Sequence, residues 1–129
     1  MANSGSVHEG PDESYTASVA VGQYVAVKLG AVKGEIDLAD ANTDESIGIT
    51  QNSAGIGESV TVRTRGRSLM VTVTSNTTIG AKLTGSTAGA GLVTTTAANK
   101  VVAIAQEVVV AGLKAEVEIV PGALRYDSF

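Results

Sequence analysis

The chain has no cysteine, no tryptophan, two prolines and one histidine among its 129 residues. Without cysteine there can be no disulfide, no thiolate nucleophile and no cysteine-ligated zinc. A Ser-His-Asp triad would have to recruit His8 from a polar stretch beside Gly10-Pro11, where a general base is hard to hold to hydrogen-bond precision. We therefore expect a protein that is not an enzyme and that holds no cofactor and no metal.

Positive charge and long apolar runs are also scarce. The net charge is −4, which disfavours nucleic acid as a partner because nucleic-acid binding needs clustered positive charge. No apolar run is long enough to cross a bilayer, and the first residues lack the basic and apolar blocks of a secretion signal. The sequence therefore predicts a protein with no membrane partner, made in the cytoplasm and used without export.

Valine, alanine and threonine dominate, with 15 glycines and only 3% aromatic residues. β-Branched residues suit pleated, half-buried surfaces, so this composition predicts an all-β domain. Its aromatic-poor core would gain from oligomeric contacts. Short apolar runs between turn residues predict strands at 24–29, 35–38, 47–50, 59–65, 68–74, 81–83, 101–106 and 115–120.

The chain divides into an N-terminal arm, residues 1–18, and a β domain, residues 19–129. The arm is polar and acidic and contains the breaker Gly10-Pro11. It is either a disordered terminus or a segment that orders on a partner. Within the domain, the acidic loop 40–45 could hold one helical turn or a weak divalent cation, and the Gly/Ala/Thr-rich segment 84–98 is expected to be a mobile connection.

Two parts of the domain repeat each other at a spacing of 55 residues. Ile47-Gly48-Ile49-Thr50-Gln51 is similar to Val102-Ala103-Ile104-Ala105-Gln106, and the same spacing places Gly57 on Gly112 and Val62 on Val117. Upstream, Val21-Gly22 is similar to Ile79-Gly80 at a slightly different spacing. Two copies are too few for a solenoid, which needs about three or more. They indicate a β domain with pseudo-repeated halves, unless the similarity arises by chance among Val/Ala/Gly-rich segments.

The stretch from Gly55 to Gly66 contains close glycines that could suggest a phosphate-binding loop. The residues after Gly57 alternate with a period of two, however, which is typical of a strand and not of the helix that such a loop requires. Beyond Gly66 the apolar side chains change from even to odd positions, at Leu69, Val71 and Val73. Because one strand cannot bury both sets on one side, we predict a bulge or bend at Gly66.

Charged side chains gather around this bend and at the equivalent place in the second half. Arg63, Arg65 and Arg67 flank Gly66, and Arg63 occupies the position that Glu118 has in the other half. They are either solvated charges that discourage strand pairing at a sheet edge or a charge patch between subunits. The members of such a patch would be Arg63, Arg65, Arg67, Glu116 and Glu118.

The order of motifs resembles the small capsid decoration, or cement, proteins of tailed bacteriophages. Val7-His8-Glu9-Gly10, Tyr15-Thr16-Ala17 and Val21-Gly22-Gln23-Tyr24-Val25 are similar to the family's opening. Ser46-Ile47-Gly48-Ile49-Thr50 and Gly57-Glu58-Ser59-Val60-Thr61-Val62-Arg63 are similar to its centre, and Ala115-Glu116-Val117-Glu118-Ile119-Val120-Pro121-Gly122 to its closing strand. The resemblance covers residues 7 to 122, with 84–98 and the tail after Gly122 departing from it.

The resemblance implies a small β-barrel or β-tulip-like domain with an extended N-terminal arm. It also implies a homotrimer on the outer surface of the virion capsid, which stabilises the head by bridging major capsid protein subunits and has no catalytic residues. The arm would contact the capsid, and we expect Val7, Glu9, Tyr15 and Val19 to make that contact, with the arm added to the shell as a strand. The alternative is a β-sandwich recognition module for carbohydrate or a host surface, which the scarcity of aromatic rings disfavours.

Overall fold

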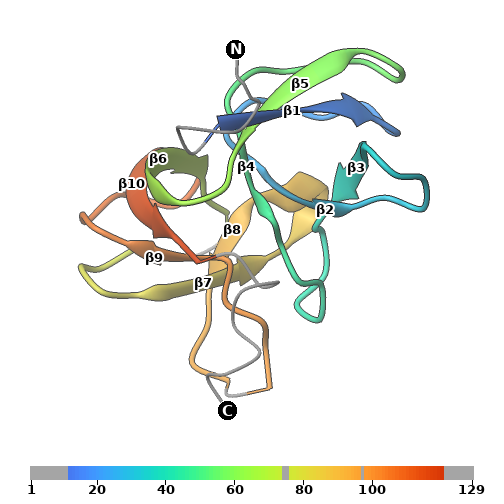
Figure 1. Cartoon of the computed structure of the whole chain (residues 1–129). Helices are drawn as coiled ribbons and strands as arrows, with labels where there is room; N and C mark the ends of the chain where they lie inside the picture. The colour runs from blue at the N-terminus through green and yellow to red at the C-terminus, as the bar shows by residue number, and fades with distance from the viewer. Residues whose placement is uncertain (1–11, 74–75, 97, 121–129) are drawn as a thin grey trace.

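The computed structural model describes residues 12–73, 76–96 and 98–120 (Figure 1). It is all-β apart from one short 3-10 turn, as the composition predicts. The elements in chain order are β1 (Asp12–Ala17), β2 (Ala26–Leu29), β3 (Glu35–Leu38), β4 (Gly48–Thr50), β5 (Ser59–Arg63), β6 (Gly66–Val71), β7 (Lys82–Gly85), η1 (Thr87–Gly89), β8 (Gly91–Val93), β9 (Ala103–Ala105) and β10 (Lys114–Ile119).

The ten strands form two halves with the same topology. Strands β1 to β5 form a closed barrel in the order β1-β3-β2-β4-β5, and β6 to β10 form a sheet in the order β6-β10-β9-β7-β8. If β6 to β10 are matched one by one with β1 to β5, the second order becomes β1-β5-β4-β2-β3. This is the order around the first barrel, followed in the opposite direction. The parallel β1–β3 contact even has a counterpart in a parallel bridge between Thr72 and Gly91. Pseudo-repeated halves, and a barrel in the first of them, are therefore confirmed.

Backbone pairing aligns the halves residue by residue, at a spacing of 55 along most of their length. Ala17 pairs with Ile36 in the first half as Thr72 does with Gly91 in the second. Around β2 the spacing is 56, because the Val21 N–H bonds to the Ala54 carbonyl where the Thr77 N–H bonds to that of Val109. Val21 thus corresponds to Thr77, and the sequence match of Val21-Gly22 to Ile79-Gly80 is wrong by two residues.

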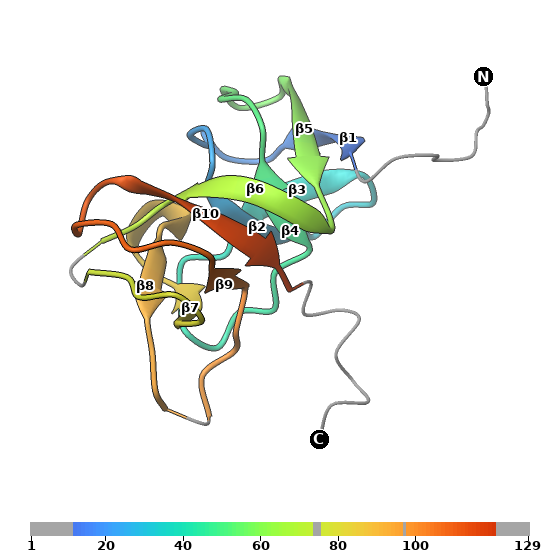
Figure 2. The same ribbon diagram turned by 90° about the vertical axis from the view of Figure 1, so that its left-hand side faces the viewer.

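The two halves lie against each other (Figures 1 and 2), and two buried side-chain clusters hold them together. Val27, Val60 and Val62 lie in the cluster of the first barrel. On the opposite face of β2, Ala26 belongs instead to the cluster of the second half, which includes Met70. Strand β2 therefore contributes to both cores, because alternate residues of a strand point to opposite faces. Burying both faces makes the molecule a single packed body.

The predicted bend at Gly66 is present and marks the boundary between the halves. Gly66 has a φ of 83°, a conformation that glycine adopts without strain, and the chain passes there from β5 of the barrel to β6 of the second sheet. The predicted change of buried face is wrong. In β6 the even positions Met70 and Ser68 are buried and Leu69 is exposed. A polar residue can occupy the buried position because the Ser68 hydroxyl accepts from the Gln51 amide of the first half and donates to the Leu69 carbonyl.

Residues 12–17 correct the predicted extent of the arm. They form β1, which pairs with β5 along its whole length and with β3 at its end, and so closes the first barrel. The sequence pattern does not predict this strand because its side chains are mostly polar, and main-chain pairing sets its position. Residues 1–11 of the arm lie outside the described residues.

Segment 84–98 also differs from the expected mobile connection. It supplies the end of β7, η1 and β8, and Leu83 pairs with Val93 across the sheet. A Cβ at Gly85 would collide with the Ala39 carbonyl oxygen of the first half. The small residues here therefore reflect close packing between the halves. In the loop 40–45, the structure has turns and no helical turn.

Candidate functional surfaces

Two cross-strand ion pairs occupy equivalent positions in the two halves. Arg63 donates to both carboxylate oxygens of Asp12, from Nε at 2.8 Å and from Nη2 at 3.1 Å. In the second half, Nε of Arg67 lies 2.8 Å from Oε1 of Glu118. Asp12 corresponds to Arg67 and Arg63 to Glu118, so the repeat keeps the pair and exchanges its charges.

The Asp12–Arg63 pair shifts the pKa values of both of its members. The Arg63 hydrogen bonds hold the pKa of the Asp12 carboxyl below its usual value, while burial acts in the opposite direction. Hydrogen bonding to Asp12 likewise raises the pKa of Arg63. Each of the two side chains keeps about a third of its surface exposed, so the pair is partly screened by solvent. Its main contribution is to fasten the beginning of β1 to β5.

The predicted charge patch is thus assembled largely within one chain. Arg67 also lies 3.6 Å from Glu116, between Nη1 and Oε2. Arg65 is exposed in the turn between β5 and β6. Four of the five proposed members therefore satisfy one another or Asp12. The role of the patch between subunits stays a prediction, and any partner would have to share these ion pairs or replace them.

A small hollow opens beside the ion pairs, at the junction of the halves. It is lined by Tyr24, Gln51, Arg63, Arg67, Ser68, Leu69, Glu107 and Glu116. The Gln51 amide donates to the Ser68 hydroxyl at 3.0 Å, which bridges β4 and β6. The Lys114 ammonium lies 5.9 Å from the centre of the Tyr24 ring, within the range of a cation–π contact. These contacts join the halves at their polar edge.

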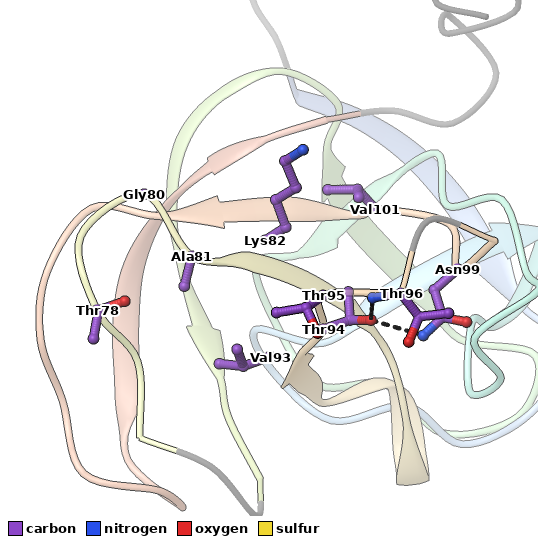
Figure 3. A pocket seen from close by; sticks show the side chains of 10 residues that line it. All are labelled: Thr78, Gly80, Ala81, Lys82, Val93, Thr94, Thr95, Thr96, Asn99 and Val101. Atoms are coloured by element: carbon purple, nitrogen blue, oxygen red, sulfur yellow. Dashed lines mark hydrogen bonds between the residues drawn. The ribbon is translucent and has the colours of Figure 1, made fainter.

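The larger pocket, of about 600 Å³, lies on the outer face of the second half (Figure 3). The Asn99 amide donates to the Thr94 hydroxyl at 2.7 Å, and Figure 3 shows these two side chains and Thr96 together at one end. Lys82 is the charged residue of the lining. The pocket offers hydroxyl, amide and ammonium groups for hydrogen bonding, and its described lining pairs no nucleophile with a base.

This pocket corresponds to a surface that is covered in the first half. Lys82 and Thr94 occupy the positions of Ala26 and Ala39, where the second half packs against the first barrel. Two positions that are alanine in the first half, where the second half covers them, are thus polar in the second half, where they are open to solvent. Polar residues on an end surface are typical of the last unit in a repeat array, so solvation explains the lining of the pocket without a ligand.

The other candidate residues lie in separate places. Val7 and Glu9 lie outside the described residues. Tyr15, in β1, and Val19 are half-buried against the core of the first barrel. The Tyr15 hydroxyl donates to Glu13 at 3.1 Å, and burial, followed by this carboxylate, raises the pKa of the phenol. Tyr15 lies within β1 and Val19 two residues beyond its end, so a contact through either residue remains a prediction.

The possible cation site at 40–45 is not formed. Asp44 binds Lys28 at 3.1 Å and Glu45 binds Lys100 at 3.4 Å. Across the described part of the chain, no three His, Cys, Asp or Glu side chains gather in a way that could hold a metal ion. Within the same residues, no helix has the length and apolar character needed to span a bilayer.

Fold and surfaces together define an all-β protein made of two copies of one five-stranded unit, with a closed barrel in the first copy and polar, partly charged edges. No family model matches the chain, and no curated protein matches it either. Among solved structures, it is similar to the N base of the head fiber gp8.5 in bacteriophage phi29. The TM-score is 0.67 at 16% identity, over 84% of this chain and 92% of that chain. The likeness establishes a shared fold.

Proposed function

We propose that this chain is a structural protein of a bacteriophage head, of the decoration or cement type. The observation that carries the proposal is the likeness to the base of a phage head fiber, which extends over nearly the whole of both chains. The order of sequence motifs supports the same class independently of the fold. In this role the protein binds the outside of an icosahedral capsid and acts without catalysis.

The mechanism we propose is mechanical bridging. A homotrimer binds major capsid protein subunits on the outer surface of the virion and holds neighbouring subunits together. The rigid two-core body suits this task, because a stiff connector resists the separation of the subunits that it joins. Three modest contacts in one trimer would give durable attachment through effective concentration.

The N-terminal arm is the proposed anchor, now limited to residues 1–11. Strand β1 is bound into the barrel and begins at the Asp12–Arg63 pair, so it holds the point from which the preceding residues extend. Val7 and Glu9 would make the primary capsid contact, with Tyr15 and Val19 at its edge. An arm that orders on its partner loses conformational entropy, so binding should depend on the mature capsid surface.

Deleting residues 2–11 tests this role. The truncated protein should keep its β structure and fail to cosediment with expanded, undecorated heads, whereas the full chain binds them. Equal uptake of both proteins would remove the arm from the proposal. Deleting 2–15 is a poorer test, because that deletion removes most of β1 and opens the barrel.

The alternative function, a recognition module for carbohydrate or a host surface, has one structural feature in its favour. The pocket of Figure 3 presents threonine hydroxyls and the Asn99 amide, which are groups that can bind sugar hydroxyls. None of the residues that line it is aromatic. Sugar sites generally stack rings on aromatic side chains, so we favour decoration. Saturable binding of a glycan, lost on Asn99→Ala, would reverse that preference.

A further inference from the structure

Four large aliphatic side chains are exposed together at one end of the second half. The loops that carry them run side by side at the left of Figures 1 and 2, between β9 and β10 and before β7. Their exposed fractions range from 57% to 74%. We call this surface the apolar tip, and it consists of Ile79, Val108, Val110 and Leu113.

Main-chain and side-chain hydrogen bonds hold the two loops rigidly together. The buried Thr77 is at the centre, with its N–H bonded to the Val109 carbonyl at 3.0 Å and its hydroxyl donating to the Glu107 carbonyl at 2.8 Å. The same hydroxyl accepts from the Val109 N–H, and the Asn76 side chain accepts from the Ala111 N–H. Val109 points inward and packs against the core. The aliphatic residues around it are therefore presented outward on a fixed scaffold.

The first half shows that the fold does not require this surface to be apolar. Its equivalent loops are joined by the same kind of pairing, between Val21 and Ala54. At the four equivalent positions, however, the first half has polar residues or glycine. In the order of the tip residues they are Gln23, Ser53, Gly55 and Glu58.

The two halves thus differ in chemistry at every position of the tip while sharing its backbone. A scattered exposed aliphatic residue is ordinary, but a group on adjacent loops marks an interaction surface. Ile56 is the one large exposed aliphatic residue in the two first-half loops that correspond to the tip, and it is equivalent to Ala111. Exposure without a partner would cost solubility, so the difference between the halves points to contact with another molecule.

We propose that the apolar tip is the surface through which copies of this chain associate with one another. Contacts between identical subunits are more apolar at their centre than contacts with transient partners. If copies of the chain bind one another through the tip, its apolar side chains are buried in the oligomer and are not left exposed to water before the protein binds a capsid. The inference rests on the proposed homotrimer and names its contact, which neither the sequence motifs nor the likeness to other structures provides.

Size and charge fit a second copy as the partner. A stable interface needs about 500 Å² from each partner, and four large aliphatic side chains, each more than half exposed, supply its apolar centre. Glu107 precedes Val108 and Lys114 follows Leu113, so both signs of charge border the tip. Glu107 accepts from the Glu116 N–H beside the polar hollow, and Lys114 lies over the Tyr24 ring. Around a symmetry axis, the Lys114 of one copy can face the Glu107 of the next, which makes the border of the tip complementary to itself.

Replacing tip residues by their first-half counterparts tests the inference. The tip variant combines Ile79→Gln, Val108→Ser and Leu113→Glu, side chains that the first half already carries on the same backbone. The control variant combines Leu29→Gln, Val32→Ser and Ile56→Ser, whose original residues are 58–75% exposed elsewhere. Light scattering and sedimentation velocity measure the mass in solution, and circular dichroism establishes that each variant is folded.

We expect the wild type and the control to be oligomers and the tip variant to be a folded monomer, with self-association weakened at least about 100-fold. A folded tip variant that remains as oligomeric as the wild type would overturn the inference. So would a wild type that is monomeric at every concentration tested. Uptake by heads is measured in parallel and tests the decoration role separately from the tip contact. If no protein binds heads but the tip variant loses self-association, the decoration role fails and the tip contact is supported.

Discussion

Gly85 provides a sharp test of how the two halves pack. It is buried at the end of β7, and an added Cβ would overlap the carbonyl oxygen of Ala39 in the first half. Since a backbone atom cannot rotate away, Gly85→Ala forces the halves apart locally. Overpacking of this kind costs about 1–3 kcal/mol, and the less flexible unfolded chain offsets about 0.4–1 kcal/mol. We expect a net loss of about 1–2 kcal/mol in the free energy of unfolding.

Thermal unfolding followed by circular dichroism measures this loss. For a chain of this size, about 1–2 kcal/mol lowers Tm by roughly 3–10 °C. The matched control is Gly22→Ala, because a Cβ there would make only an ordinary contact, 3.9 Å from Cγ1 of Val25. The control should melt close to the wild type. If Gly85→Ala melts no lower than Gly22→Ala, the second half does not pack on the first as described.

Two further substitutions probe the strand pairing and the shared core. Asp12→Asn should cost about 0.5–1 kcal/mol at pH 7, because the pair with Arg63 is partly exposed. The pKa of Asp12 is lowered in the folded state, so the stabilisation is present above the unfolded pKa near 3.9 and is lost as the pH falls through the folded pKa. Urea titrations at pH 7 and pH 2 should therefore differ between the proteins only at pH 7. Met70→Ala should cost about 2–5 kcal/mol in urea, since Met70 is fully buried, whereas Leu69→Ala should cost little.

The sequence predicted the strands whose apolar residues alternate. In β5, Val60 and Val62 are both fully buried, as their period of two requires. The repeat was visible in the stretches that form β4 and β9, where both copies keep the same small and aliphatic residues. It could be followed into β5 and β10 because Gly57 and Gly112 both have positive φ, at 82° and 89°, in equivalent turns.

Other parts of the fold depend on contacts that leave no periodic pattern. Strand β1 is formed by pairing with β5, and its polar side chains resemble those of a tail. In β8, Gly91 lies against Met70, where a Cβ would be only 3.0 Å from the Met70 sulfur. In the sequence, small residues at such close contacts have the same composition as a flexible connection, because the opposing surface cannot be seen there. The sequence already aligned Arg63 with Glu118, but their partners Asp12 and Arg67 came only from strand pairing. The apolar tip required the hydrogen-bond register, because the spacing changes to 56 around β2.

Imaging of decorated heads by electron microscopy tests the proposed function most directly. Expanded heads that lack decoration would be mixed with the full chain, purified and reconstructed with imposed icosahedral symmetry. The account predicts additional density on the outer surface near three-fold positions, with three copies of the two-halved β body spanning neighbouring capsid protein subunits. Heads that remain bare at saturating protein, or density confined to the inner surface, would contradict it.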